Sequence, residues 1–187
     1  MSSHERIRRQ QILREAEGYL ELLSAPAEPF FASVEVRHRL ARRILKILEG
    51  AEFSGPRKAQ QLYLRGMALK AMDLFGQAVR PLEQSAEIDP DNLSVWLALG
   101  WCYKRVGRLD LAIQSLEEAV EVDSEAAIVY YNLACYWSLA SNVKHAVHYL
   151  RIAFDLDPNF RDLVDSEPDF DPIRRHPGFQ AAREVIV

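Results

Sequence analysis

An internal repeat with a period of 34 residues constrains this chain more than any other feature. Two columns of small residues and one column of leucine recur at this spacing without an insertion, at Gly66, Gly100 and Ala134, at Ala78, Ala112 and Ala146, and at Leu82, Leu116 and Leu150. A constant period of this length is typical of chains that stack one supersecondary unit on the next. The sequence therefore predicts a repeat array over residues 59–158, with three units at about 59–92, 93–126 and 127–160.

Each unit carries the pattern of two amphipathic helices. In the second unit, apolar residues fall at helical spacing in two groups: Trp96, Leu99 and Tyr103, then Leu109, Ala112, Ile113, Leu116 and Val120. Residues that tolerate turn geometry separate the two groups in every unit, at Asp73, Gly107 and Ser141-Asn142. Small residues in the columns would let paired helices approach closely. The pattern predicts an all-α fold built from antiparallel helix pairs.

These units resemble tetratricopeptide repeats. The resemblance rests on Trp96, Leu99-Gly100, Tyr103, Ala112, Leu116 and Ala119 in the second unit, and on Tyr130, Leu133-Ala134, Trp137, Ala146, Leu150, Ala153 and Pro158 in the third. The first unit departs from the pattern at Leu62, Arg65 and Leu69, which stand in the tryptophan, leucine and tyrosine columns. The resemblance implies a right-handed superhelical solenoid.

The two flanking segments are predicted to close the ends of this array, because a stack of helix pairs must cover its terminal apolar faces. Residues 1–58 hold two apolar stripes, at 4–24 and 33–49, which indicate an N-terminal helical pair that acts as a cap or a degenerate repeat. Residues 159–187 read as a short helix and a wrapped tail that form a C-terminal closing segment. This segment resembles those that end repeat groups in bacterial proteins, so we expect a bacterial source.

Composition and motifs argue against catalysis. The chain has no Gly-rich phosphate loop, and its two cysteines, Cys102 and Cys135, lack the spacing of a metal or redox motif. His145 and His148 lie three residues apart and could share a helix face, but no third metal ligand is evident. We therefore expect no enzyme activity, no cofactor and no metal, with a metal-assisted hydrolase using these histidines as a remote alternative.

Charge and hydropathy restrict the partners. The formal net charge is −4, which argues against binding nucleic acid over the whole surface. No signal peptide or long apolar stretch is present, so we expect a cytoplasmic protein without membrane contact. A basic run in the second predicted helix, at Arg37, Arg39, Arg42, Arg43 and Lys46, is either a solvated face or a surface for an acidic partner.

The resemblance also implies a concave groove lined by the first helix of each pair. Transferred onto this register, the partner-binding residues are Tyr63, Met67, Lys70, Leu97, Trp101, Lys104, Arg105, Ile128, Tyr131 and Cys135. We expect a protein-interaction module, such as an adaptor, scaffold or chaperone, whose groove binds a peptide or helix with apolar anchors and acidic residues. The alternative is a self-association unit, a homo-oligomer or a chain whose own N-terminal pair or tail fills the groove.

Overall fold

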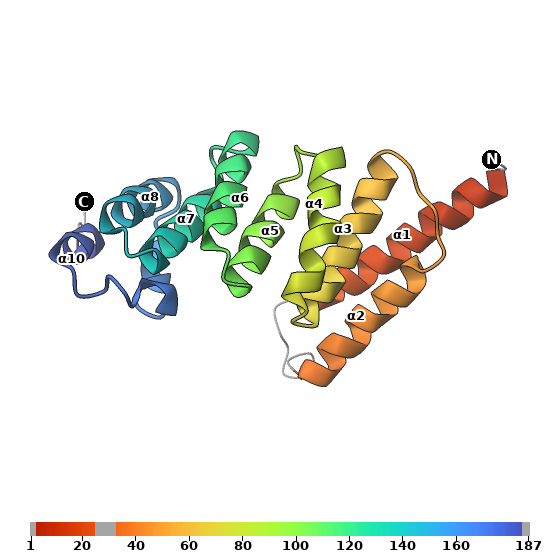
Figure 1. Ribbon diagram of the computed structural model, residues 1–187, viewed down its shortest axis with the longest axis horizontal. Helices are drawn as coiled ribbons and strands as arrows, with labels where there is room; N and C mark the ends of the chain where they lie inside the picture. The colour runs from red at the N-terminus through yellow and green to blue at the C-terminus, as the bar shows by residue number, and fades with distance from the viewer. Residues whose placement is uncertain (1–2, 25–32, 185–187) are drawn as a thin grey trace. The chain divides into compact units, whose positions relative to one another are not determined.

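The computed structural model describes residues 3–24 and 33–184, and this part of the chain is helical without a strand (Figure 1). Four helices precede the middle of the chain: α1 (Ser3–Ser24), α2 (Val34–Leu48), α3 (Pro56–Ala71) and α4 (Phe75–Ile88). Four more follow: α5 (Leu93–Arg105), α6 (Leu109–Val122), α7 (Ala127–Leu139) and α8 (Val143–Leu156). The C-terminal part holds α9 (Phe160–Leu163), the 3₁₀ helix η1 (Pro168–Phe170) and α10 (Pro177–Glu184). The predicted all-α helical-repeat array is confirmed.

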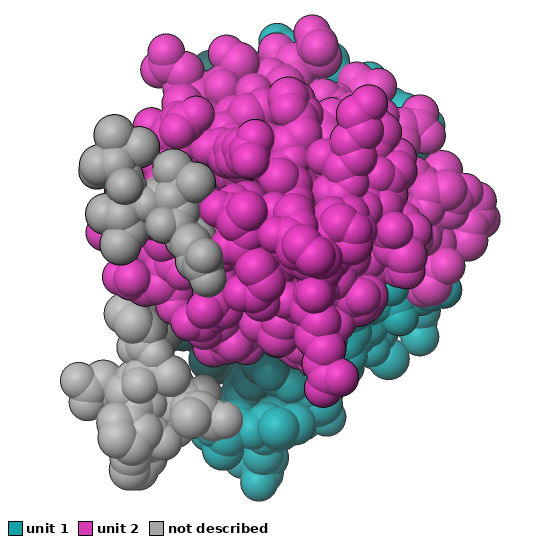
Figure 2. Space-filling model, turned by 90° about the vertical axis from the view of Figure 1, so that its left-hand side faces the viewer, with its two compact units in different colours: residues 1–106 teal, residues 107–187 magenta. Residues whose placement is uncertain are grey.

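The chain forms two compact units, coloured separately in Figure 2. Unit 1 comprises residues 1–106 and unit 2 comprises residues 107–187. The boundary falls between α5 and α6, inside the second predicted repeat. The three-part division of the chain at residues 58 and 158 stays a prediction.

The turns inside the three predicted repeats share one backbone conformation. Asp73, Gly107 and Ser141 stand 34 residues apart, and their φ angles are 59°, 78° and 56°. All three lie in the left-handed region, which glycine adopts readily and which other residues adopt at a cost. The period therefore governs the backbone as well as the packed side chains, and the turns predicted from the sequence are confirmed.

Unit 1 has a core in which three helices meet. Leu13 and Ala16 of α1 pack with Ala41, Ile44 and Leu48 of α2, and all of them contact the buried side chains of Leu64 and Ala68 on α3. The helix pair α1–α2 therefore covers one side of the first predicted repeat. On the other side of α3, an added Cβ at Gly66 would lie 2.5 Å from Cγ of Leu82, so α3 and α4 approach closely at this glycine.

Unit 2 is closed by its C-terminal tail. Val164, Phe170, Ile173 and Phe179 are buried, although they lie in a segment broken by prolines. Arg174 ties this tail together, because its guanidinium donates hydrogen bonds to the carbonyls of Val164 (3.2 Å), Asp165 (3.3 Å) and Glu167 (2.6 Å) and also contacts the Asp171 carboxylate. The tail packs along α7 and α8. In the described ranges, no helix has both the length and the apolar composition needed to cross a bilayer.

Candidate functional site

Seven of the ten predicted groove residues lie in unit 1, on α3 and α5. We call this set the α3–α5 surface: Tyr63, Met67, Lys70, Leu97, Trp101, Lys104 and Arg105. All seven side chains are half-buried or exposed. The two helices contact each other, and the side chain of Ser94 on α5 forms a hydrogen bond with Tyr63 on α3. The structure thus brings together the part of the predicted groove that belongs to the first two repeats.

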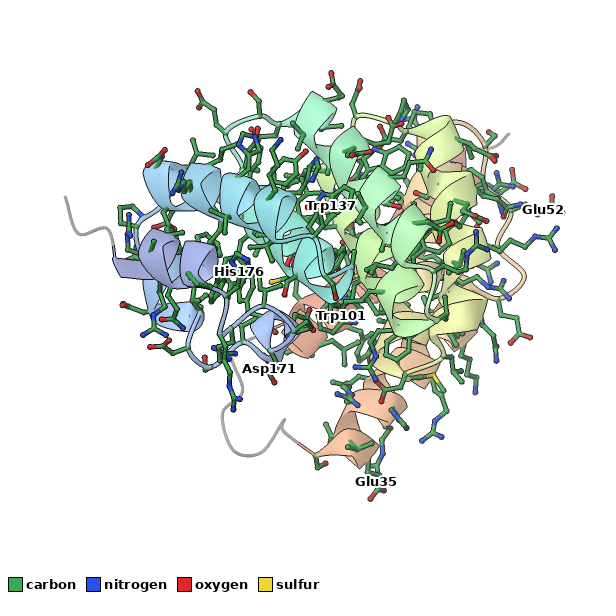
Figure 3. The ribbon with its side chains drawn as sticks, turned by 60° about the vertical axis from the view of Figure 1, so that its left-hand side comes forward. Glu35, Glu52, Trp101, Trp137, Asp171 and His176 are labelled. Carbon is green, nitrogen blue, oxygen red and sulfur yellow. The ribbon has the colours of Figure 1, made fainter. Side chains whose placement is uncertain are left out.

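Trp101 lies at the centre of this surface (Figure 3). Its side chain is 36% exposed, a large value for a tryptophan in a helix that is otherwise well packed. The ammonium nitrogens of Lys70 and Lys104 lie 5.7 Å and 4.5 Å from the centroid of its ring. A cation within about 6 Å of a ring face is attracted by the π electrons. The lysines therefore form a positively charged, aromatic patch with the indole.

Burial changes the protonation of groups in and beneath the patch. It lowers the pKa of Lys70, because removal from water disfavours the ammonium form, and it raises the pKa of Tyr63, an effect that the hydrogen bond with Ser94 opposes. Burial also raises the pKa of the Cys102 thiol to about 11. Since a bound carboxylate would compensate the lost hydration of the Lys70 ammonium, the patch is suited to an anionic group.

Phe75 extends the α3–α5 surface, although the sequence pattern did not single it out. The guanidinium carbon of Arg105 lies 4.6 Å from the centroid of the Phe75 ring, at the start of α4. Phe75 follows the left-handed turn at Asp73 and stands outside the packing columns, so periodicity gave no signal for it. An aromatic residue two places after a repeat turn, with an arginine at the end of the next helix, is the signal that could have found it.

The three predicted groove residues of unit 2 differ in exposure. Ile128 is 41% exposed, whereas Tyr131 and Cys135 are 4% and 2% exposed. The Tyr131 ring packs against Phe160, with centroids 4.8 Å apart, and against Phe170, at 5.7 Å. Contrary to the predicted lining role, the tail therefore covers Tyr131 and Cys135, and no partner can reach them while it stays in place. Of the alternatives left open by the sequence, closure by the chain's own tail describes α7.

The histidine pair does not assemble a metal site in the described part of the chain. His145 stacks on Trp137, with ring centroids 4.6 Å apart, and His148 contacts Tyr149 at 5.2 Å. Across residues 3–24 and 33–184, no group of three or more His, Cys, Asp or Glu side chains lies close enough to hold a metal ion. Both histidines instead serve as partners for aromatic rings on α7 and α8.

We expect both cysteines to resist modification in the folded protein. Cys102 is fully buried with a raised pKa, and Cys135 is 2% exposed, so neither offers an accessible thiolate. Reaction with the thiol reagent DTNB at about pH 8 should release no chromophore from the native protein and should release it from both cysteines in denaturant. Rapid labelling of the native protein would show that one of the two helices, α5 or α7, opens readily.

Comparison with known proteins agrees with this architecture. Residues 69–134 match the family model of the tetratricopeptide repeat. No curated protein sequence matches the chain. Among solved structures, YrrB, described as a TPR protein with an unusual peptide-binding site, is similar with a TM-score of 0.59 and 20% identity, over 71% of this chain and 65% of YrrB, slightly under two thirds of its length.

Two further structures have the same fold. MamA from AMB-1 is similar with a TM-score of 0.59 and 21% identity, over 83% of this chain and 100% of MamA. The type III secretion chaperone SycD of Yersinia enterocolitica, solved with a peptide of the translocator YopD, is similar with a TM-score of 0.53 and 22% identity, over 57% of this chain and 84% of SycD. This chain therefore carries tetratricopeptide repeats and has the fold of the tetratricopeptide-repeat proteins.

Proposed function

We propose that this protein is a protein-interaction module that binds a peptide or helix of a partner on the α3–α5 surface. The observation that carries the proposal is the exposed indole of Trp101 with the cations of Lys70 and Lys104 against it. Aromatic residues beside positive charge are frequent anchors at protein interfaces. The fold supports the proposal, since YrrB has a peptide-binding site and SycD was solved with a bound peptide.

The chemistry of the surface specifies the ligand. Tyr63, Met67, Leu97 and Trp101 offer apolar area that is partly open to water, which suits an apolar anchor. The ammonium of Lys70 has lost part of its hydration, which suits a carboxylate placed near the indole. We therefore expect a partner segment that combines a leucine or an aromatic residue with neighbouring aspartate or glutamate.

We expect Trp101→Ala to weaken such binding by about 2 kcal/mol or more, the usual hot-spot threshold, which corresponds to roughly 30-fold in Kd. Peptides are first selected from a phage-displayed library on the full-length protein, and their affinities are then measured by fluorescence anisotropy. The side chain is partly exposed, so the substitution should leave the melting temperature nearly unchanged.

Ile88→Ala is a matched control for this substitution. Ile88 is an exposed apolar residue of α4, 42% accessible, and it does not belong to the α3–α5 surface. The control should change the affinity less than about two-fold. Equal losses in both variants, or selected peptides that bind Trp101→Ala as tightly as the original protein, would refute the proposal.

Self-association is the second candidate function, because the tail of this chain already covers Tyr131 with its own aromatic residues. A surface that accepts Phe160 and Phe170 from the same chain could accept a similar segment from a second copy. Size-exclusion chromatography with light scattering separates the two candidates. A concentration-independent monomer favours the interaction module, whereas a dimer that Trp101→Ala dissociates favours self-association through the α3–α5 surface.

A further inference from the structure

We propose that unit 1 contains a second binding site, a cleft between α2, α3 and α4 that accepts an acidic segment of a partner protein. The cleft has a volume of about 1100 Å³. Five basic side chains line it, and one carboxylate, that of Glu49, accompanies them: Arg42 and Lys46 on α2, Lys58 and Arg65 on α3, and Arg80 on α4. We call it the basic cleft. It is built from residues other than those of the α3–α5 surface.

The basic run of α2 divides between paired residues and residues of the cleft. Arg37, Arg39 and Arg43 form ion pairs with Asp73 (2.8 Å), Glu35 (2.9 Å) and Glu15 (3.1 Å), respectively. Arg42 and Lys46 of the same helix, together with Arg65 and Arg80, have no carboxylate partner within residues 3–24 and 33–184. Positive charge therefore accumulates in the cleft without neutralisation by the unit itself.

Arg65 shows why a cleft exists at this place. It stands in the column that holds Leu99 and Leu133 in the other two repeats, and those leucines are 2% and 0% exposed. Arg65 is exposed and lines the cleft. A leucine here would be packed beside its neighbours, whereas an arginine keeps its charged head in water. The departure of the first repeat from the consensus thus coincides with the opening.

The floor of the cleft favours a peptide over a bare anion. Leu48, Leu62 and Leu69 line it, and each of these leucines is less than one tenth exposed. The volume is slightly above the range of roughly 300–1000 Å³ that holds drug-sized ligands, which leaves space for several residues of a chain. Positive charge around an apolar floor is complementary to a segment that alternates acidic and apolar side chains.

The test uses the full-length protein and a fluorescein-labelled synthetic peptide of repeated Glu-Asp-Leu triplets, with anisotropy as the readout. Two charge reversals, Lys46→Glu with Arg80→Glu, should weaken binding at least about ten-fold, since both residues are exposed members of the cleft. The matched control is Arg14→Glu with Arg39→Glu. It alters the net charge equally at two exposed positions outside the cleft, and it should weaken binding less than about two-fold.

Arg65→Leu provides a second, independent variant. It introduces the residue that the same column holds in the other repeats, so the protein should fold with an equal or higher melting temperature. We expect the affinity for the triplet peptide to fall several-fold, because the substitution removes one charge and fills part of the opening. An unchanged affinity in this folded variant would contradict the proposal.

The remaining outcomes each decide the question. Trp101→Ala should leave binding of the triplet peptide unchanged, so the cleft can be correct even if the α3–α5 surface is not a binding site. If Trp101→Ala abolishes binding and the cleft variants do not, the peptide occupies the α3–α5 surface and the cleft proposal is wrong. Equal loss in the cleft variant and its matched control would indicate unspecific attraction and overturn it. A homopolymeric RNA that binds the cleft more tightly than the peptide would likewise overturn it.

Discussion

Phe170→Ala is expected to destabilise unit 2 by about 3–5 kcal/mol, the usual cost of truncating a buried phenylalanine. Its side chain is fully buried, and its ring lies 5.7 Å from the centroid of Tyr131 and 5.2 Å from that of Phe179. The substitution leaves a cavity at the point where the tail joins α7. Urea unfolding followed by circular dichroism measures the loss, and exposure of Tyr131 should appear as a change in near-ultraviolet signal.

Leu163→Ala is the control for this prediction. Leu163 belongs to the same tail, but its side chain is 49% exposed, so its truncation should change the free energy of unfolding by less than about 0.5 kcal/mol. If Phe170→Ala unfolds at the same urea concentration as the original protein, the tail is not a stabilising part of unit 2. The predicted closing role of residues 159–187 would then have to be given up.

Gly66→Leu should destabilise unit 1 by about 3 kcal/mol, at the upper end of the usual cost of overpacking. Even a Cβ at this position would lie 2.5 Å from Cγ and 2.6 Å from Cδ2 of Leu82, a side chain that is itself fully buried. Because Leu82 has no free space to move into, α3 and α4 would have to separate. Thermal unfolding of the variant measures the effect as a lower melting temperature.

Gly18→Ala tests the same kind of change where the structure leaves room. Gly18 lies inside α1, and an added Cβ would have no neighbour within 4 Å. Alanine in an open helical position should stabilise the protein by about 0.5–1 kcal/mol, because glycine loses more backbone entropy on folding. A melting temperature that falls in Gly18→Ala, or that stays constant in Gly66→Leu, would contradict the helix contacts described above.

The helix pairs could be predicted from the sequence because each repeat is a local unit. The columns at Ala78, Ala112 and Ala146 mark fully buried positions, and the turns at 73, 107 and 141 share one conformation. These features depend on residues close together in the chain, where helical periodicity is informative. The cytoplasmic, bacterial setting rests on composition and resemblance, and it stays a prediction.

The fate of the predicted groove could be foreseen only in part. Trp101 and its lysines lie within two neighbouring helices, so their register sufficed to bring them together. Tyr131 and Cys135 are covered by a tail whose prolines obscure its periodicity, and no repeat rule says where such a segment packs. The basic cleft likewise depends on how α2 lies beside α3 and α4, although the charge run that lines it was visible in the sequence.

The hydrogen bonds of Arg174 determine how the covering of Tyr131 responds to solution conditions. Three of its four recorded acceptors are backbone carbonyls, which do not titrate, and Asp171 supplies the one carboxylate. A clasp made chiefly of neutral acceptors neither loosens on acidification nor weakens much as salt screens charge, in contrast to an ion-pair network. The tail of unit 2 is therefore a permanent wall rather than an acid-operated gate.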